Sequence, residues 1–146
     1  MSTIHASAVL IGAKAALIRG PAGSGKSQLV WQLIEAAKQG SLPFARLVAD
    51  DRAHIQACHG RLLVRPAIEL VGLLEIRGLG IRRIPYEAMA LVGLAVELAA
   101  TDAERYPSAE AKKTNIDGVV LPRLAVAAGQ SALSLVLAYL GTPPDA

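Results

Sequence analysis

The chain has little cysteine and few aromatic residues, and each shortage argues against a class of protein. Its single cysteine, Cys58, has no partner for an internal disulfide, which favours a reducing compartment. Aromatic residues make up only 3% of the chain, and its 15 lysines and arginines are scattered along the sequence. Proteins that bind single-stranded nucleic acid stack bases on aromatic rings, and duplex binders present a basic helix or stripe. We therefore expect no nucleic-acid partner.

Long apolar runs are also missing, although 53% of the 146 residues are hydrophobic. No segment approaches the roughly 18 consecutive apolar residues of a membrane-spanning helix. Residues 1–5 lack the basic and then apolar order of a signal peptide, and the sequence contains no internal repeat. These features predict one cytoplasmic domain over residues 1–146 with no membrane association.

The strongest functional signal is a glycine-rich stretch that matches the phosphate-binding pattern G-x-x-x-x-G-K-[ST]. A glycine-rich turn can direct successive backbone N–H groups toward an anion, and the helix that follows adds its positive N-terminal end. Lys26 would reach the β- and γ-phosphates of a bound ligand, and the Ser27 hydroxyl would take one position around a Mg²⁺ ion. The pattern is formed by Gly20, Pro21, Ala22, Gly23, Ser24, Gly25, Lys26 and Ser27.

A phosphate loop of this kind follows a strand and begins a helix, and the flanking sequence predicts both. Residues 15–18 are a short apolar run suited to a buried strand, and residues 28–38 place apolar side chains at helical spacing before Gly40. A second apolar strand over residues 8–11 comes a hairpin-length turn earlier. The site would then lie on a hairpin, which indicates a mixed α/β topology. The alternative is a Gly/Ser loop that caps a helix without a ligand.

Two acidic segments are candidates for the rest of such a site. Asp50 and Asp51 end the next predicted strand, residues 46–51, where one carboxylate can hold Mg²⁺ and another can accept a proton from a hydroxyl nucleophile. An ordinary Asp-Asp turn is the alternative. Glu75 is the single acid in the apolar run 73–81 and needs a partner, either Arg77 in an ion pair at a sheet edge or a metal ion.

Other segments complete the predicted order of elements. His5 precedes the first strand and, on its chemistry alone, is an exposed terminal histidine. His54, Cys58 and His59 lie in a predicted hairpin, residues 52–64, whose alternation explains them without a metal. The sequence further predicts a connection starting at residues 82–85, a buried strand over residues 90–98, a polar mobile loop over residues 101–114, an extended segment over residues 119–126 and a helix over residues 131–139.

Three motifs, taken together, resemble the catalytic domain of HPr kinase/phosphorylase. Members of this family carry a Walker A loop, an A-D-D-R element after the next strand and an E-I-R-G-L-G-I signature. All three occur here in that order, the second at residues 49–52 and the third at residues 75–81. The resemblance runs from about residue 5 to about residue 140. It implies a mixed-sheet α/β P-loop kinase domain similar to the phosphoenolpyruvate carboxykinase nucleotide-binding fold.

The resemblance implies ATP-dependent phosphorylation of a serine on HPr, the small phosphocarrier of the sugar phosphotransferase system, or on a paralogue. In many members inorganic phosphate also drives removal of this phosphoryl group, and members assemble as hexamers. The roles carried over are Asp51 as the base for the serine hydroxyl, Lys26 on the phosphates, Ser27 and Glu75 as Mg²⁺ ligands, Asp50 as a supporting carboxylate and His5 as an active-site histidine.

Three departures from the family pattern bear on function. The sequence corresponds to the catalytic domain without the family's usual N-terminal domain, so it resembles the short form found in some proteobacteria. Glu87 stands where longer members have a catalytic arginine, with Arg82 or Arg83 as candidate substitutes. The basic residues of the closing segment are reduced to Arg123, with residues 127–130 uncharged, which bears on the phosphorylase activity in particular. Two other functions stay open: a non-catalytic ATP-binding regulatory module that binds a partner, and a small-molecule kinase. The absence of a lid with paired arginines disfavours the kinase of small molecules.

Overall fold

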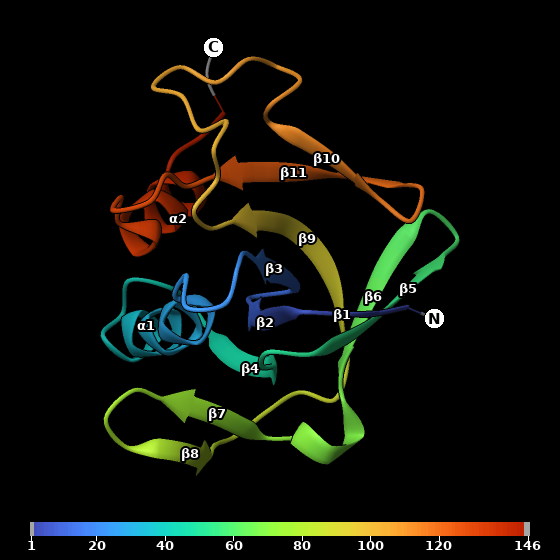
Figure 1. Ribbon diagram of the computed structural model, residues 1–146, viewed down its shortest axis with the longest axis vertical. Coiled ribbons are helices and arrows are strands. Elements are labelled where there is room, and N and C mark those ends of the chain that lie inside the picture. The colour runs from blue at the N-terminus through green and yellow to red at the C-terminus, as the bar shows by residue number, and fades with distance from the viewer. Residues whose placement is uncertain (1, 145–146) are drawn as a thin grey trace.

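The computed structural model describes residues 2–144 and has one large mixed sheet, a small hairpin and two helices (Figure 1). The strands are β1 (Ser2–Ile4), β2 (Ala6–Ile11), β3 (Lys14–Arg19), β4 (Ala45–Ala49), β5 (Ala53–Cys58), β6 (Arg61–Pro66), β7 (Leu73–Ile76), β8 (Gly80–Arg83), β9 (Ala90–Glu97), β10 (Lys113–Ile116) and β11 (Val119–Ala125). The helices are α1 (Lys26–Lys38), the short 3-10 helix η1 (Ile68–Leu70) and α2 (Ala132–Gly141).

The large sheet has the strand order β1-β5-β6-β9-β3-β2-β4, and β11 with β10 branches from β9. The β3–β9 and β9–β11 pairs are parallel, and the other pairs are antiparallel. The apolar strand β9 joins the two halves of the sheet, since its start pairs with β6 and its end lies between β3 and β11. The predicted hairpin of β2 and β3 and the mixed sheet are therefore confirmed.

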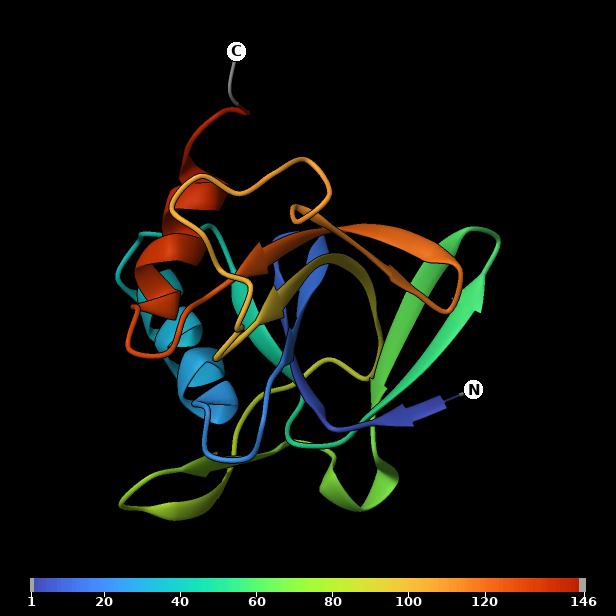
Figure 2. The same cartoon turned by 45° about the horizontal axis from the view of Figure 1, so that its top comes forward.

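Both faces of this sheet are buried. On one face α1 and α2 pack together (Figure 1). Helix α1 buries Leu29, Leu33 and Ala36 of the apolar stripe that its sequence spacing predicts, and Ile34 beside them. On the other face the sheet curls over a second core that includes Leu17, Ile55 and Leu62 (Figure 2). Helix α2 begins where the sequence predicts, because the Ser131 side chain accepts a hydrogen bond from Ser134 N at 3.2 Å.

The β7–β8 hairpin lies outside the large sheet, next to α1. One of its faces contributes Leu74 and Ile76 to the core that α1 covers, while Glu75 and Ile81 form a cross-strand pair on the other face. The expectation that residues 82 and 83 begin a connection is wrong, because they form the end of β8, where they pair with β7. The predicted loop also ends earlier than residue 114, since Lys113 already pairs with Pro122 of β11.

Among residues 2–144, no helix has the length and apolar character that crossing a membrane requires.

Candidate active site

The phosphate loop joins the end of β3 to the start of α1. Gly23 and Gly25 have φ angles of +79° and +101°, which side chains rarely allow. Ser24 N donates to Pro21 O at 3.1 Å and closes the turn. The first turn of α1 contains no acidic residue, and no side chain caps it. Its free N–H groups and the positive end of the helix dipole would therefore favour an anion at this position.

Two side chains of the loop have polar atoms turned into it. Lys26 is only 8% exposed, and its Nζ donates to Gly20 O at 2.9 Å and to Pro21 O at 3.3 Å. Ser24 Oγ is buried and has no hydrogen-bond partner within residues 2–144. A buried hydroxyl without a partner is uncommon in folded proteins. Both observations fit a loop that closes around a polar, anionic ligand.

Asp50 connects three separate elements at the edge of the phosphate loop. It is 6% exposed, and its Oδ1 accepts hydrogen bonds from Ser7 Oγ at 2.8 Å and from Ser27 Oγ at 2.6 Å. Its Oδ2 accepts a bond from Glu75 N at 3.1 Å. Three donors offset the cost of burying a carboxylate and tie β2, α1 and β7 to one point. Ser7 was not among the predicted site residues, although a serine in an otherwise apolar strand is a visible signal.

Asp51 follows in a strained turn that projects from the end of β4. Its φ of +67° is uncommon for a residue with a side chain, and Arg52 N donates to Asp50 O at 2.8 Å across it. Asp51 N donates to Ser7 Oγ at 3.1 Å. The turn directs Asp51 toward solvent, on the wall of a cavity, while its neighbour Asp50 is buried. Two adjacent carboxylates thus occupy very different environments.

That cavity, which we call the acidic cavity, has a volume of about 350 Å³. It brings together the predicted residues Lys26, Ser27, Asp50, Asp51 and Glu75. Glu75 and Arg77 both line this cavity but form no ion pair within residues 2–144, so the structure does not show the first of the two partners that the sequence left open for Glu75. The remainder of the lining is formed by Ala22, Gly23, Gly25, Gln28, Leu70, Leu73, Arg77 and Ile81.

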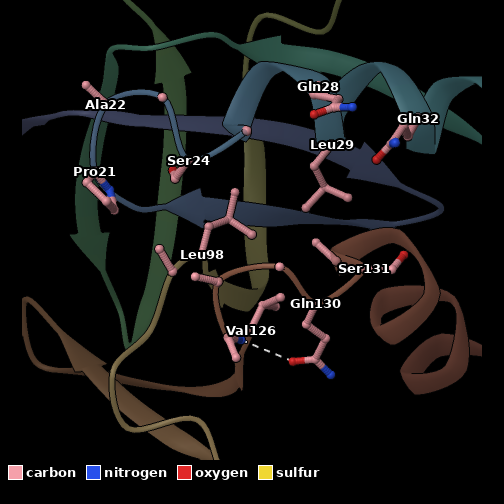
Figure 3. Close-up of a pocket in the computed structure, with 17 residues that line it drawn as sticks. Pro21, Ala22, Ser24, Gln28, Leu29, Gln32, Leu98, Val126, Gln130 and Ser131 are labelled. Atoms are coloured by element: carbon pink, nitrogen blue, oxygen red, sulfur yellow. Dashed lines mark hydrogen bonds between the residues drawn. The ribbon is translucent and has the colours of Figure 1, made fainter.

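A second cavity, the amide cavity, lies on the other side of the phosphate loop and has a volume of about 610 Å³ (Figure 3). It contains no charged side chain, and its polar groups include the amides of Gln28, Gln32 and Gln130. Gln130 Oε1 accepts a hydrogen bond from Ala127 N at 3.1 Å, which leaves its NH₂ group available to a ligand. None of these amides was predicted as part of a site. Gln28 and Gln32 belong to α1 and Gln130 to the β11–α2 connection, and no local sequence pattern shows that these segments meet.

The two cavities meet at the loop, since both are lined by Ala22, Gly23, Gly25 and Gln28. The amide cavity has the size of a site for a small organic molecule, and its lining combines uncharged polar groups with apolar side chains. The acidic cavity has carboxylates and cations instead. A ligand that runs along the loop would therefore meet only uncharged groups on one side and charged side chains of both signs on the other.

The donors of the acidic cavity suit a hard cation. Ser27 supplies a hydroxyl, and Asp50, Asp51 and Glu75 supply carboxylates. In the part of the chain that the structure describes, no three His, Cys, Asp or Glu side chains converge into a metal site by themselves. This set fits Mg²⁺, which keeps several waters and binds through one or two protein oxygens together with substrate phosphates.

Several residues considered from the sequence lie outside both linings. His5 is exposed in the bend between β1 and β2, although this bend is at the same edge of the sheet as Ser7. Glu87 lies at the outer side of β4, with its Oε1 3.7 Å from Arg46 Nη1. Arg82 and Arg83 belong to β8 and do not line the acidic cavity. The cations that do line it are Lys26 and Arg77.

Arg123 serves to anchor a loop. Its guanidinium donates to Asp102 Oδ1 at 2.9 Å and to Ala111 O at 3.0 Å, and its Nε lies 3.8 Å from Glu97 Oε1. Glu97 also pairs with Arg19, the last residue before the phosphate loop. The hydrogen bond from Arg123 holds the pKa of the exposed Asp102 carboxyl below its ordinary value. The loop over residues 101–112 is thereby tied to the base of the site.

The chain is similar to curated HPr kinase/phosphorylases. It is 40% identical to that of Streptococcus thermophilus over 93 residues, which are 63% of this chain and 26% of the relative. It is 42% identical to that of Exiguobacterium sp. over 82 residues, or 56% of this chain and 24% of the relative. The chain thus spans about a quarter of the length of these relatives. No protein-family model matches it.

The same similarity is found in three dimensions. The structure of the Hpr(Ser) kinase/phosphatase from Coxiella burnetii matches with a TM-score of 0.75, covering 97% of this chain and 95% of that chain at 22% identity. The chain has the HPr kinase/phosphatase fold. The resemblance stated from the three motifs is therefore confirmed, and so is the α/β class with a mixed sheet.

Proposed function

We propose that this chain is a cytoplasmic, Mg²⁺- and ATP-dependent protein-serine kinase that acts on an HPr-type phosphocarrier. The observation that carries the proposal is the meeting of an uncharged cavity and an acidic cavity at one phosphate loop. The similarity to HPr kinase/phosphorylases supports the choice of acceptor. We also propose that inorganic phosphate can reverse the reaction, as the names of those relatives suggest.

The amide cavity would hold the nucleoside part of ATP. Its amides can donate to and accept from a base, and Leu29, Leu98 and Val126 offer apolar contacts. The triphosphate would then follow the loop toward the acidic cavity, with its oxygens on the loop amides and the first turn of α1. Lys26 would exchange its two backbone carbonyls for phosphate oxygens, which are stronger, charged partners.

The acidic cavity would be the place of phosphoryl transfer. The acceptor hydroxyl oxygen forms a bond to the γ-phosphorus, the bond from this phosphorus to the β–γ bridging oxygen breaks, and ADP leaves. Asp51, as an exposed carboxylate on the wall, would accept the hydroxyl proton. Ser27 and Glu75 would hold the Mg²⁺ ion, which when bound neutralises charge on the transferring group. Asp50 would keep Ser27 and Glu75 in place.

Arg77 is our candidate for the second cation at the transferring phosphate. It directly follows β7 and lines the acidic cavity, whereas Glu87, Arg82 and Arg83 do not. A positive group at this position would stabilise the charge that spreads over the phosphoryl oxygens. His5 stays a candidate for the acceptor side, because its bend lies at the edge of the sheet where Ser7 meets the two aspartates.

The apolar part of the wall of the acidic cavity also supports a protein, and not a small molecule, as the acceptor of the phosphoryl group. Leu70, Leu73 and Ile81 line it, and Ile81 is 60% exposed beside Leu79, which is also 60% exposed. These side chains can contact apolar residues that flank a serine, whereas a small polar acceptor would gain little from them. We propose a homo-oligomer, a hexamer by family resemblance, and a mass from light scattering would test it.

The deciding experiment is transfer of labelled phosphate from Mg²⁺·ATP to purified HPr-type proteins. We expect incorporation on serine by the wild-type chain, and losses of at least a hundredfold in Lys26→Ala and in Asp51→Asn. Asp51→Asn should still bind Mg²⁺·ATP. If the wild type binds Mg²⁺·ATP but transfers no phosphate to any of these proteins, the chain is instead a nucleotide-binding regulatory module. Full transfer by Asp51→Asn would refute only the role of Asp51 as base.

A further inference from the structure

Ser7 makes one hydrogen bond to each aspartate of the site. It lies in β2, and none of its surface is exposed. Its Oγ accepts a hydrogen bond from Asp51 N at 3.1 Å and donates to Asp50 Oδ1 at 2.8 Å. Because one lone pair of the hydroxyl is engaged by an N–H group, its proton is directed to the carboxylate. Both the orientation and the polarity of this hydroxyl are therefore fixed.

The bond to Asp51 matters because the backbone of Asp51 is strained. A non-glycine residue at a φ of +67° keeps that conformation only when its surroundings hold it there. One restraint is local, the bond from Arg52 N to Asp50 O at 2.8 Å. The other is Ser7, which belongs to a different strand, 44 residues away in sequence. The bond to Ser7 thus fixes the position of the turn relative to β2, whereas the bond from Arg52 N to Asp50 O only holds the turn together.

The bond to Asp50 places the same hydroxyl beside the phosphate loop. Asp50 Oδ1 receives both Ser7 Oγ and Ser27 Oγ, so the position of one donor affects the other. We infer that Ser7 is a positioning residue that sets the direction of the Asp51 carboxylate and the distance of the acidic turn from the phosphate loop. Its effect on rate rests on the proposed kinase function, whereas its effect on the turn does not.

The kinetic test compares Ser7→Ala with Val9→Ala. Both remove a small part of a fully buried side chain of β2, but the side chain of Val9 packs in the apolar core next to α1 and has no polar atom to bond to an aspartate. We expect Ser7→Ala to lower kcat for phosphoryl transfer about tenfold, because small displacements of a reacting group carry large costs. The Kd for Mg²⁺·ATP should stay within about twofold, and Val9→Ala should keep the wild-type kcat.

A second readout does not depend on activity. Hydrogen exchange of the Asp51 amide, followed by NMR, reports directly on the bond to Ser7 Oγ. We expect this amide to exchange at least tenfold faster in Ser7→Ala than in the wild type, with no such change in Val9→Ala, once exchange at core amides shows that both variants are folded.

The two readouts separate the inference from the proposed function. If the wild type transfers no phosphate, the proposed function fails, and the Asp51 amide alone decides whether Ser7 holds the turn. If the wild type is active, wild-type kcat in Ser7→Ala overturns the inference. Unchanged exchange of the Asp51 amide in Ser7→Ala overturns it in either case.

Discussion

At the scale of single residues, Gly20 lies very close to Ser24 and Leu98, and this close packing constrains the start of the phosphate loop. A Cβ atom built on Gly20 would lie 2.6 Å from Ser24 Oγ, 3.0 Å from Leu98 Cβ and 3.1 Å from Leu98 O. Leu98 is held there by a bond from its N to Arg19 O at 2.8 Å. The first glycine of the motif is therefore required by packing between two strand ends, in addition to any contact with a phosphate.

Gly20→Ala should accordingly lower the free energy of unfolding by about 1–3 kcal/mol, because backbone or loop atoms must move to admit the methyl group. Chemical denaturation measures this change. Gly141→Ala is the matched control, since its Cβ would have no neighbour within 4 Å and its helical position favours alanine. If the two variants unfold at the same denaturant concentration, the steric account of Gly20 is wrong.

At the scale of elements, one face of the β7–β8 hairpin packs against the core and the other lines the acidic cavity. Leu74 and Ile76 bury one face against the core beneath α1, and the bond from Glu75 N to Asp50 fixes its position at the site. The opposite face, with Leu73, Glu75 and Ile81, forms a wall of the acidic cavity. The alternation of side chains along a strand lets one hairpin both anchor itself and meet a substrate.

We expect Ile81→Asp to lower kcat/KM for the protein acceptor about tenfold, because it puts a charge on an apolar contact surface close to phosphates. Binding of Mg²⁺·ATP should change much less. Ile68→Asp provides the control, since Ile68 is 83% exposed in η1 and does not line the cavity. Steady-state kinetics with varied acceptor concentration measures the effect. Equal losses in the two variants would contradict a specific role for the hairpin.

At the scale of the whole molecule, the site is assembled on the edge of one sheet whose two faces are both buried. Helices α1 and α2 cover one face, and the curl of the sheet encloses the other (Figure 2). The end of β3, the end of β4 and the start of β2 meet at this edge, because β2 runs antiparallel to both neighbours. Ligand binding at such a junction should stabilise the fold as a unit.

Mg²⁺·ATP at about 100 times its Kd should therefore raise the midpoint of thermal unfolding by roughly 5–10 °C, which corresponds to about 2.7 kcal/mol of binding energy. Thermal scans with and without nucleotide measure the shift. Lys26→Ala should lose most of it, and ATP with EDTA serves as a second control. A shift of the same size in Lys26→Ala would argue against the phosphate loop as the binding site.

The sequence alone predicted the glycine-rich loop between a strand and a helix, because its glycines, lysine and serine all lie within residues 20–27. It likewise determined the β2–β3 hairpin, α1 and the positions of Asp50, Asp51 and Glu75, whose signals are local. The motif resemblance also predicted the fold. All of these depend on residues that are neighbours in the chain or on patterns with a fixed period.

The tertiary structure decided how these segments meet. Ser7 and Asp50 are 43 residues apart and come into contact only because β2 and β4 pair. No local sequence pattern therefore predicts their hydrogen bond. The amide cavity depends on the parallel alignment of β3, β9 and β11, which brings Leu98 and residues 126–132 to the phosphate loop. Long-range strand pairing sets these contacts, and it is governed by the packing of the complete core.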